Sequence, residues 1–103
     1  MAQLNYAQIG DALAAREPFQ GNSMWAEYAT PDVLPQIGRL PDGAREHLVR
    51  DKWDADKQGC SFYVVYSYGT PIAWAWGNHV TIPEERYSVT TSKQQGKARA
   101  HLR

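Results

Sequence analysis

The densest hydrophobic pattern in the chain lies between residues 62 and 76. The run FYVVYSY at 62–68 consists of aromatic and β-branched residues with one serine, which predicts a strand. A turn signal, Gly-Thr-Pro at 69–71, is followed by large side chains that alternate with alanine over 72–76. The large side chains predicted to share one face of this second strand are Ile72, Trp74 and Trp76. The two runs together predict an antiparallel hairpin at 62–76.

A helical period appears near the N-terminus of the chain. Tyr6, Ile9 and Leu13 recur at spacings that place them on one face of a helix. Asn5 is a suitable N-cap, and Pro18 disfavours helical geometry in the residue before it. We therefore expect a helix over 6–16.

A second helix is predicted over 44–53, with Asp42 as its cap after the Pro-Asp-Gly turn. Leu48 and Val49 are expected to face inward. The side chains expected to face outward are Arg45, Glu46, Arg50 and Asp51. The polar stretch 54–59 is predicted to close this helix as a loop, and the segment 19–28 is predicted to be a short strand or a loop over the core.

Shorter elements are predicted after the hairpin. Residues 80–82 and 86–90 read as strands, and the hydroxyls of 90–92 are suited to cap a helix over 93–102. The whole pattern predicts one domain, residues 1–103, of the α+β class. We expect a small antiparallel sheet of three or four strands packed with an N-terminal, a middle and a short C-terminal helix.

Charge is balanced overall but segregated along the chain. There are 11 Lys and Arg residues and 11 Asp and Glu residues, yet the segment 86–103 holds five basic residues and no acidic one. Such a basic segment either binds an anionic partner or folds back on the acidic remainder, and the sequence leaves both open. No run approaches the roughly 18 apolar residues of a membrane span, and the N-terminus lacks a signal-peptide pattern. With Cys60 as the only cysteine, a cytoplasmic protein without membrane contact is expected.

Two motifs in the C-terminal half resemble a pattern found in small uncharacterised proteins of actinobacterial phages. They are SYGTPIAW at 67–74, an unbroken match, and YSVTTSKQQ at 87–95. The second motif departs from the family pattern at Lys93, where arginine is usual, and at Gln94, where histidine is usual. The resemblance implies a phage or prophage origin and no particular chemistry, and Gln94 argues against a required histidine at that position.

The sequence offers little for catalysis. His47, His79 and His101 are far apart and lack metal-ligand spacing, and no nucleophile–base pair or phosphate-binding loop is recognisable. Glu84 and Glu85 are adjacent, which on a strand sends them to opposite faces. We expect a protein that is not an enzyme and that uses no cofactor and no metal.

Two binding hypotheses follow, and the first is a protein-interaction module. Aromatic residues are frequent interface anchors, and one small sheet cannot bury so many of them unless helices or a partner cover both faces. The aromatic surface would bind a host or phage protein, consistent with a host-directed role, and a homo-oligomer would use the same surface. Its residues are Tyr66, Tyr68, Trp74 and Trp76. The alternative is that the predicted helices cover the sheet and these side chains are core.

The second hypothesis is a nucleic-acid-binding module. A helix led by hydroxyl residues and rich in cations suits phosphate groups, and the sheet aromatics would stack on unpaired bases. The anion-binding residues would be Thr91, Ser92, Lys93, Lys97, Arg99 and Arg103. An isoelectric point near 6.8 counts against a dominant phosphate contribution.

Overall fold

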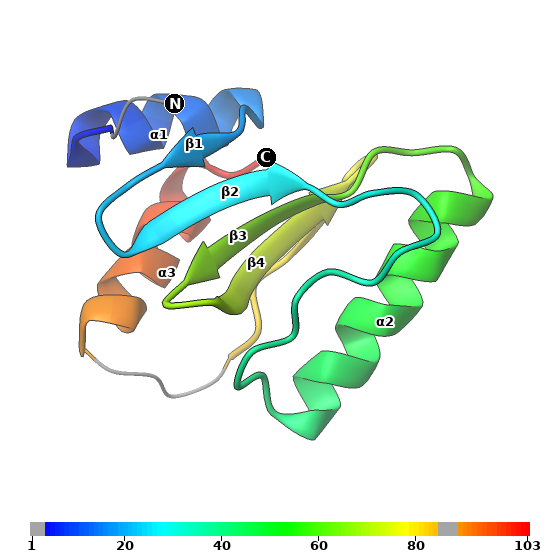
Figure 1. Ribbon diagram of the computed structural model, residues 1–103. Helices are drawn as coiled ribbons and strands as arrows, with labels where there is room; N and C mark the ends of the chain where they lie inside the picture. Colours follow the sequence, from blue (N-terminus) through cyan, green and yellow to red (C-terminus); the bar gives the residue numbers. More distant parts are fainter. Residues whose placement is uncertain (1–3, 85–88) are drawn as a thin grey trace.

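A five-stranded antiparallel sheet lies between two helical layers in the computed structural model, which describes residues 4–84 and 89–103. The strands follow one another across the sheet in chain order, and α3 passes behind them in the view of Figure 1. The elements are α1 (Tyr6–Ala15), β1 (Phe19–Gln20), β2 (Met24–Tyr28), α2 (Asp42–Lys57), β3 (Tyr63–Ser67), β4 (Thr70–Trp76), β5 (His79–Thr81) and α3 (Val89–His101). The α+β prediction with three helices is confirmed, and the sheet has five strands because 19–28 forms two of them.

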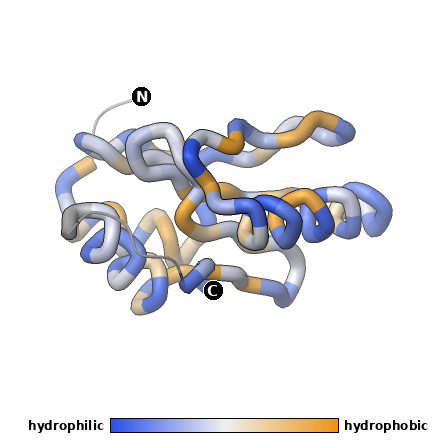
Figure 2. Tube along the Cα trace, turned by 90° about the horizontal axis from the view of Figure 1, so that it is seen from below, coloured by the Kyte–Doolittle hydropathy of each residue, from blue (hydrophilic) through white to orange (hydrophobic). Residues whose placement is uncertain are grey.

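Helices α1 and α3 share one face of the sheet. Asn5 caps α1 as predicted: its side chain accepts from the Gln8 backbone N–H, and the Gln8 side chain accepts from the Asn5 N–H. The two helices approach closely at Gly10, where a Cβ would lie 3.0 Å from the His101 ring. Hydrophilic and hydrophobic positions alternate along the helical turns (Figure 2), as in helices with one side on a core. The core of this layer contains Ile9, Leu13, Phe19, Met24, Tyr63, Val65, Ile72, Ala98 and Leu102.

The opposite face of the sheet is covered by α2 and by the segment 29–41 that precedes it. Leu48 and Ala55 of α2 and Leu40 of the segment contribute its aliphatic part. The sheet contributes Phe62, Val64, Tyr66, Trp74 and Trp76. Both faces of the hairpin are therefore buried, which explains why both of its side-chain sets are hydrophobic.

One predicted face assignment is wrong because β4 contains a bulge. Val65 pairs with Ala73, but the next residue, Tyr66, pairs with Pro71, so Ile72 is an extra residue in the ladder. The alternation shifts at this point. Ile72 consequently packs in the α1 and α3 layer, on the opposite face from Trp74 and Trp76.

Helix α2 is longer than predicted at both ends. It begins at Asp42, so the cap position belongs to Pro41, and the Asp42 carboxylate instead pairs with Arg45 at 2.8 Å. It continues to Lys57, through residues predicted to be a loop, because Ala55 is needed in the core. Residues 54–57 were predicted to be a loop because three of the four are charged, although Ala55 among them is buried.

The C-terminal helix also begins earlier than predicted. Val89 opens α3, so positions 89–92 form its first turn rather than a strand end and a cap. The rest of the strand predicted over 86–90 lies outside the described residues. Thr91, Gln94 and Gln95 are buried against the sheet, where their polar groups have hydrogen-bond partners.

Candidate functional site

Three of the four aromatic residues predicted to contact a partner lie inside the protein. The exposed fraction is 2% for Tyr66, 0% for Trp74 and 5% for Trp76, because α2 and the segment 29–41 cover them. Tyr68, at the turn between β3 and β4, is 66% exposed. The structure therefore leaves Tyr68 alone of the four available to another molecule.

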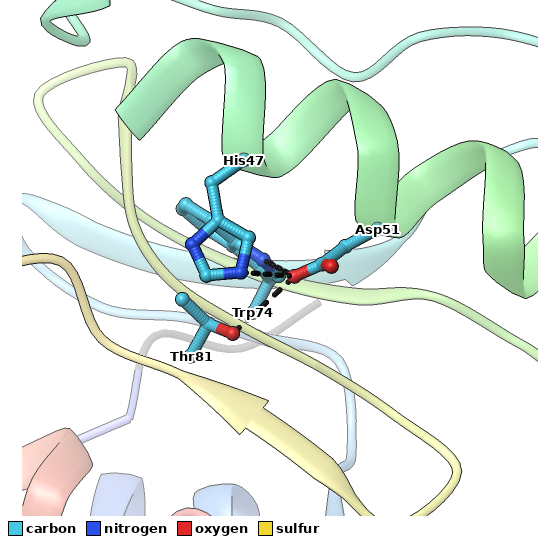
Figure 3. A network of polar contacts seen from close by, with 4 residues as sticks. All are labelled: His47, Asp51, Trp74 and Thr81. Atoms are coloured by element: carbon cyan, nitrogen blue, oxygen red, sulfur yellow. Dashed lines mark hydrogen bonds and ion pairs between the residues drawn. The ribbon is translucent and has the colours of Figure 1, made fainter. Parts of the chain in front are cut away.

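A single carboxylate oxygen ties α2 to the sheet at Trp74 (Figure 3). Oδ2 of Asp51 accepts from the Trp74 indole Nε1 at 2.9 Å and from the Thr81 hydroxyl at 3.3 Å. His47 Nε2 lies 3.1 Å from the same oxygen, and the His47 ring meets the Trp74 ring edge-on at 5.9 Å. The prediction that Asp51 faces outward is wrong, because the buried indole N–H needs an acceptor.

This cluster resembles half of a catalytic triad, in which a carboxylate orients a histidine that activates a nucleophile. Within the described part of the chain, however, the polar and ring contacts of the His47 side chain are those with Asp51 and Trp74, and no hydroxyl or thiol hydrogen-bonds to it. The arrangement orients an indole and holds a helix in place. The sequence analysis missed this cluster. The i, i+4 spacing of His47 and Asp51, which makes them neighbours on a helix, is the signal that could have indicated it.

A fully buried charge directly follows Asp51 in α2. Lys52 is fully buried and pairs with Asp56, whose carboxylate also accepts from the Asp32 backbone N–H at 3.0 Å. Desolvation by burial opposes ionisation of Asp56. The hydrogen bonds from Lys52 and Asp32 and the Lys52 charge nevertheless keep the Asp56 pKa below its ordinary value. A cavity of about 390 Å³ adjoins this pair and includes the half-buried Cys60 in its wall.

The predicted anion-binding residues are largely brought together on α3. Ser92, Lys93, Arg99 and Arg103 are exposed on or just after the helix, and Lys97 is half-buried with its ammonium 4.3 Å from the centroid of the Tyr6 ring. Thr91 differs, because it is buried and its hydroxyl lies 3.0 Å from that of Ser67. The set is thus four cations and one serine that are at least partly exposed on or just after α3.

Among the described residues, the cations of α3 form no ion pair with an acidic side chain. All three ion pairs found within residues 4–84 and 89–103 join residues of α2 to one another. Residues 4–17 and 89–103 together hold five Lys and Arg against two Asp and Glu, a net charge of +3. The layer on the other face of the sheet, residues 29–57, holds five Lys and Arg against six Asp and Glu, so the α1 and α3 layer is the more positive of the two.

The two motifs noted in the sequence meet in the folded protein. Ser67 of the first motif contacts the hydroxyl of Thr91 and donates to Oε1 of Gln94, both from the second motif. Gln94 in turn donates to Ser23 at 2.8 Å. Position 94 therefore needs a side chain that both donates and accepts, which glutamine provides and which histidine also provides. The motif residues join α3 to the sheet.

Neither a membrane helix nor a metal site is found in the described residues. No helix there combines the length and the apolar character needed to cross a bilayer. No group of three or more His, Cys, Asp or Glu side chains in the same part of the chain is placed to hold a metal ion.

Comparison with known proteins gives one match. A family described as "Family of unknown function (DUF8033)" matches residues 10–98, from within α1 to the last turn of α3. No curated protein and no solved structure shows significant similarity to the chain.

Proposed function

The chain belongs to the family of unknown function DUF8033, and we propose that it is a non-enzymatic module that binds nucleic acid through the outer face of α3. The observation that carries this proposal is the set of four cations that, among the described residues, have no carboxylate partner. Phosphate contacts of Lys and Arg supply most of the non-specific affinity of such proteins. The cations are Lys93, Lys97, Arg99 and Arg103.

The neutral overall charge of the protein is compatible with a phosphate-binding site on α3. The Cα trace measures 34 × 26 × 21 Å, and α2, which holds five acidic and four basic residues, lies on the opposite face of the sheet from α3. Electrostatic interactions between exposed charges are screened within about 8 Å at physiological ionic strength. A phosphate at α3 therefore responds mainly to the local positive charge.

Reversing two of these charges is expected to weaken binding strongly without unfolding the protein. For Lys97→Glu with Arg99→Glu, we expect roughly a tenfold or greater loss of affinity for single-stranded DNA, since two phosphate contacts become repulsive. The logarithm of affinity should fall with the logarithm of salt concentration with a slope of about −3 for four contacts, and less steeply in the variant. Fluorescence anisotropy at several salt concentrations measures both quantities.

The matched control reverses two exposed arginines on the other side of the sheet. Arg39→Glu with Arg50→Glu gives the same change in net charge but leaves α3 unaltered. We expect it to retain most of the affinity. Equal losses in the two double variants, or binding that does not depend on salt, would contradict a phosphate-binding role for α3.

A protein partner at the β3–β4 turn is a second candidate, favoured by the conformation of Tyr68. The backbone φ angle of this residue is 51°, in the left-handed region. This conformation costs a residue with a side chain roughly 1–2 kcal/mol. The Tyr68 side chain is also exposed. Strain of this kind is often retained for function. The partner would be a host or phage protein.

Replacing Tyr68 by asparagine, which tolerates the left-handed region, is expected to stabilise the protein by up to about 1 kcal/mol. The same change should abolish the binding of any protein partner that contacts Tyr68. The measurement is thermal unfolding together with affinity capture from nuclease-treated actinobacterial lysate. A captured protein that is retained by the variant would rule out Tyr68 as its anchor.

The origin and location of the protein are also proposals. Because the motifs at 67–74 and 87–95 resemble those of actinobacterial phage proteins, we propose that the protein is phage-encoded and acts in the cytoplasm of the host. Nucleic acid and host proteins are both accessible there.

A further inference from the structure

A cavity lies beside the cationic face of α3. It has a volume of about 240 Å³ and is formed where the start of α1 meets the β1–β2 turn and α3. Its lining combines apolar and aromatic side chains with polar ones, among them Tyr6, Ile9, Met24, Asn22, Ser23 and Gln94. It is separate from the cavity at Asp56 and from the His47 cluster.

The cavity is within reach of two of the cations. Tyr6, in its wall, donates from its hydroxyl to the Lys93 carbonyl at 3.3 Å and lies beneath the ammonium group of Lys97. Gln94, also in the wall, follows Lys93 directly in α3. A ligand group in the cavity would therefore have a positive charge at its edge.

The polar lining retains hydrogen-bonding capacity. The Ser23 hydroxyl accepts from Gln94 at 2.8 Å, and its own proton has no acceptor among the described residues. The Asn22 amide is exposed and makes no hydrogen bond within that part of the chain. A hydroxyl donor and an amide that both donates and accepts suit the edge of a nucleobase.

The size of the cavity limits what it can hold. Sites for drug-sized molecules span roughly 300–1,000 Å³, so a cavity of about 240 Å³ admits one planar ring system rather than a whole nucleotide. The sugar and phosphate would remain outside, where Lys93 and Lys97 lie.

We propose that this cavity takes up one unstacked base of a single-stranded nucleic acid while Lys93 and Lys97 contact the flanking phosphates. The inference rests on the proposed function and adds the form of nucleic acid bound. A duplex would have to unpair a base to occupy the cavity, which costs a few kcal/mol, so single strands are preferred.

The test compares two single strands of about 12 nucleotides with the same number of phosphates. One strand carries thymine at every position, and the other carries an abasic sugar at every position. We expect the protein to bind the abasic strand on the order of tenfold more weakly, with the same salt dependence, because the base contact is lost and the phosphate contacts remain.

Variants at two positions locate the base contact. Asn22→Trp places a large side chain at an exposed position of the lining, and Tyr6→Leu removes the aromatic wall. Because a tryptophan at position 22 could itself stack on a base, Asn22→Leu is made alongside it as a bulky non-aromatic variant. We expect Asn22→Leu to remove the preference for the thymine strand while leaving affinity for the abasic strand unchanged. Tyr6→Leu should also remove the preference, and because the Tyr6 ring contacts Lys97, it should weaken binding of both strands. Thermal unfolding checks that each variant is folded.

The outcomes separate this inference from the proposed function. Equal affinity of the wild-type protein for the two strands would overturn base binding and leave phosphate binding at α3 intact. A preference for thymine that survives in the folded Asn22→Leu and Tyr6→Leu variants would overturn the assignment to this cavity. Failure to bind either strand would overturn the proposed function and the inference with it.

Discussion

Replacing Trp74 by alanine is expected to lower the free energy of unfolding by about 4 kcal/mol. The side chain is completely buried between α2 and the sheet, and loss of a buried tryptophan typically costs 3–5 kcal/mol through lost transfer energy and a residual cavity. The change also leaves the Asp51 carboxylate without its buried donor. Urea unfolding measures the effect, and an unchanged slope with urea concentration would show that the two-state transition is preserved.

Trp53→Ala is the matched control for this change. Trp53 lies on the outer side of α2 and is partly exposed, so we expect a loss of less than about 1 kcal/mol. Asp51→Asn, which keeps the shape but removes the charge, should fall between the two alanine variants. A near-neutral Trp74→Ala would mean that α2 does not cover this strand, and Trp74 would again be a candidate for partner contact.

The second large loss of stability is expected when the carboxylate that pairs with the buried Lys52 is removed. Asp56→Ala is expected to destabilise the protein by about 3 kcal/mol, because it leaves the Lys52 ammonium buried and unpaired. We expect the low end of the known range because Asp56 retains some exposure at the edge of a cavity. Chemical unfolding of the single variant at neutral pH provides the measurement.

The double variant Lys52→Met with Asp56→Ala should recover most of this loss. Methionine retains an apolar stem, and a buried ion pair can often be replaced by apolar residues at little cost. If the double variant is as unstable as Asp56→Ala alone, the loss comes from the Asp32 backbone contact or the cavity rather than from the unpaired charge.

The same pair makes a specific contribution to stability in acid. The Asp56 pKa is lowered in the folded protein, so in the acid range the unfolded chain binds more protons than the folded one. The stabilisation is therefore complete above the unfolded value of about 4 and is lost as pH falls through the folded pKa. We expect the wild-type protein to lose more stability than the double variant below about pH 4, as measured by unfolding at each pH.

The parts of the fold that the sequence predicted are those with a regular hydrophobic period. The spacing of Tyr6, Ile9 and Leu13 predicted α1 closely, and the hairpin at 62–76 corresponds to β3 and β4. The bulge at Ile72 was not predictable from alternation, because it depends on which residues of two strands pair.

The burial of the aromatic sheet residues was harder to predict, because the sequence of α2 does not show that this helix covers them. Its sequence is rich in charge, the prediction placed Asp51 on its outward side, and whether the helices cover the aromatic sheet was left open. In the structure, Lys52 is wholly buried and Asp51 turns toward Trp74, so charged residues complete the cover. Sequence period alone does not distinguish an outward charge from one with a buried partner. Of the residues predicted to bind an anion, Thr91 faces the core, Lys97 is half-buried and the others are exposed; their role in binding stays a prediction.

The position of α3 along the chain sets the order in which the protein is assembled during translation. The ribosome releases the strands and both earlier helices before α3, so the sheet face shared by α1 and α3 stays incomplete until α3 emerges. Nascent chains at that stage are expected to expose apolar residues such as Ile72 and Ala73 and to lack the cations of α3. The capacity that we assign to α3 would thus arise only after the sheet has been synthesised, when the Ser67–Gln94 contact can form.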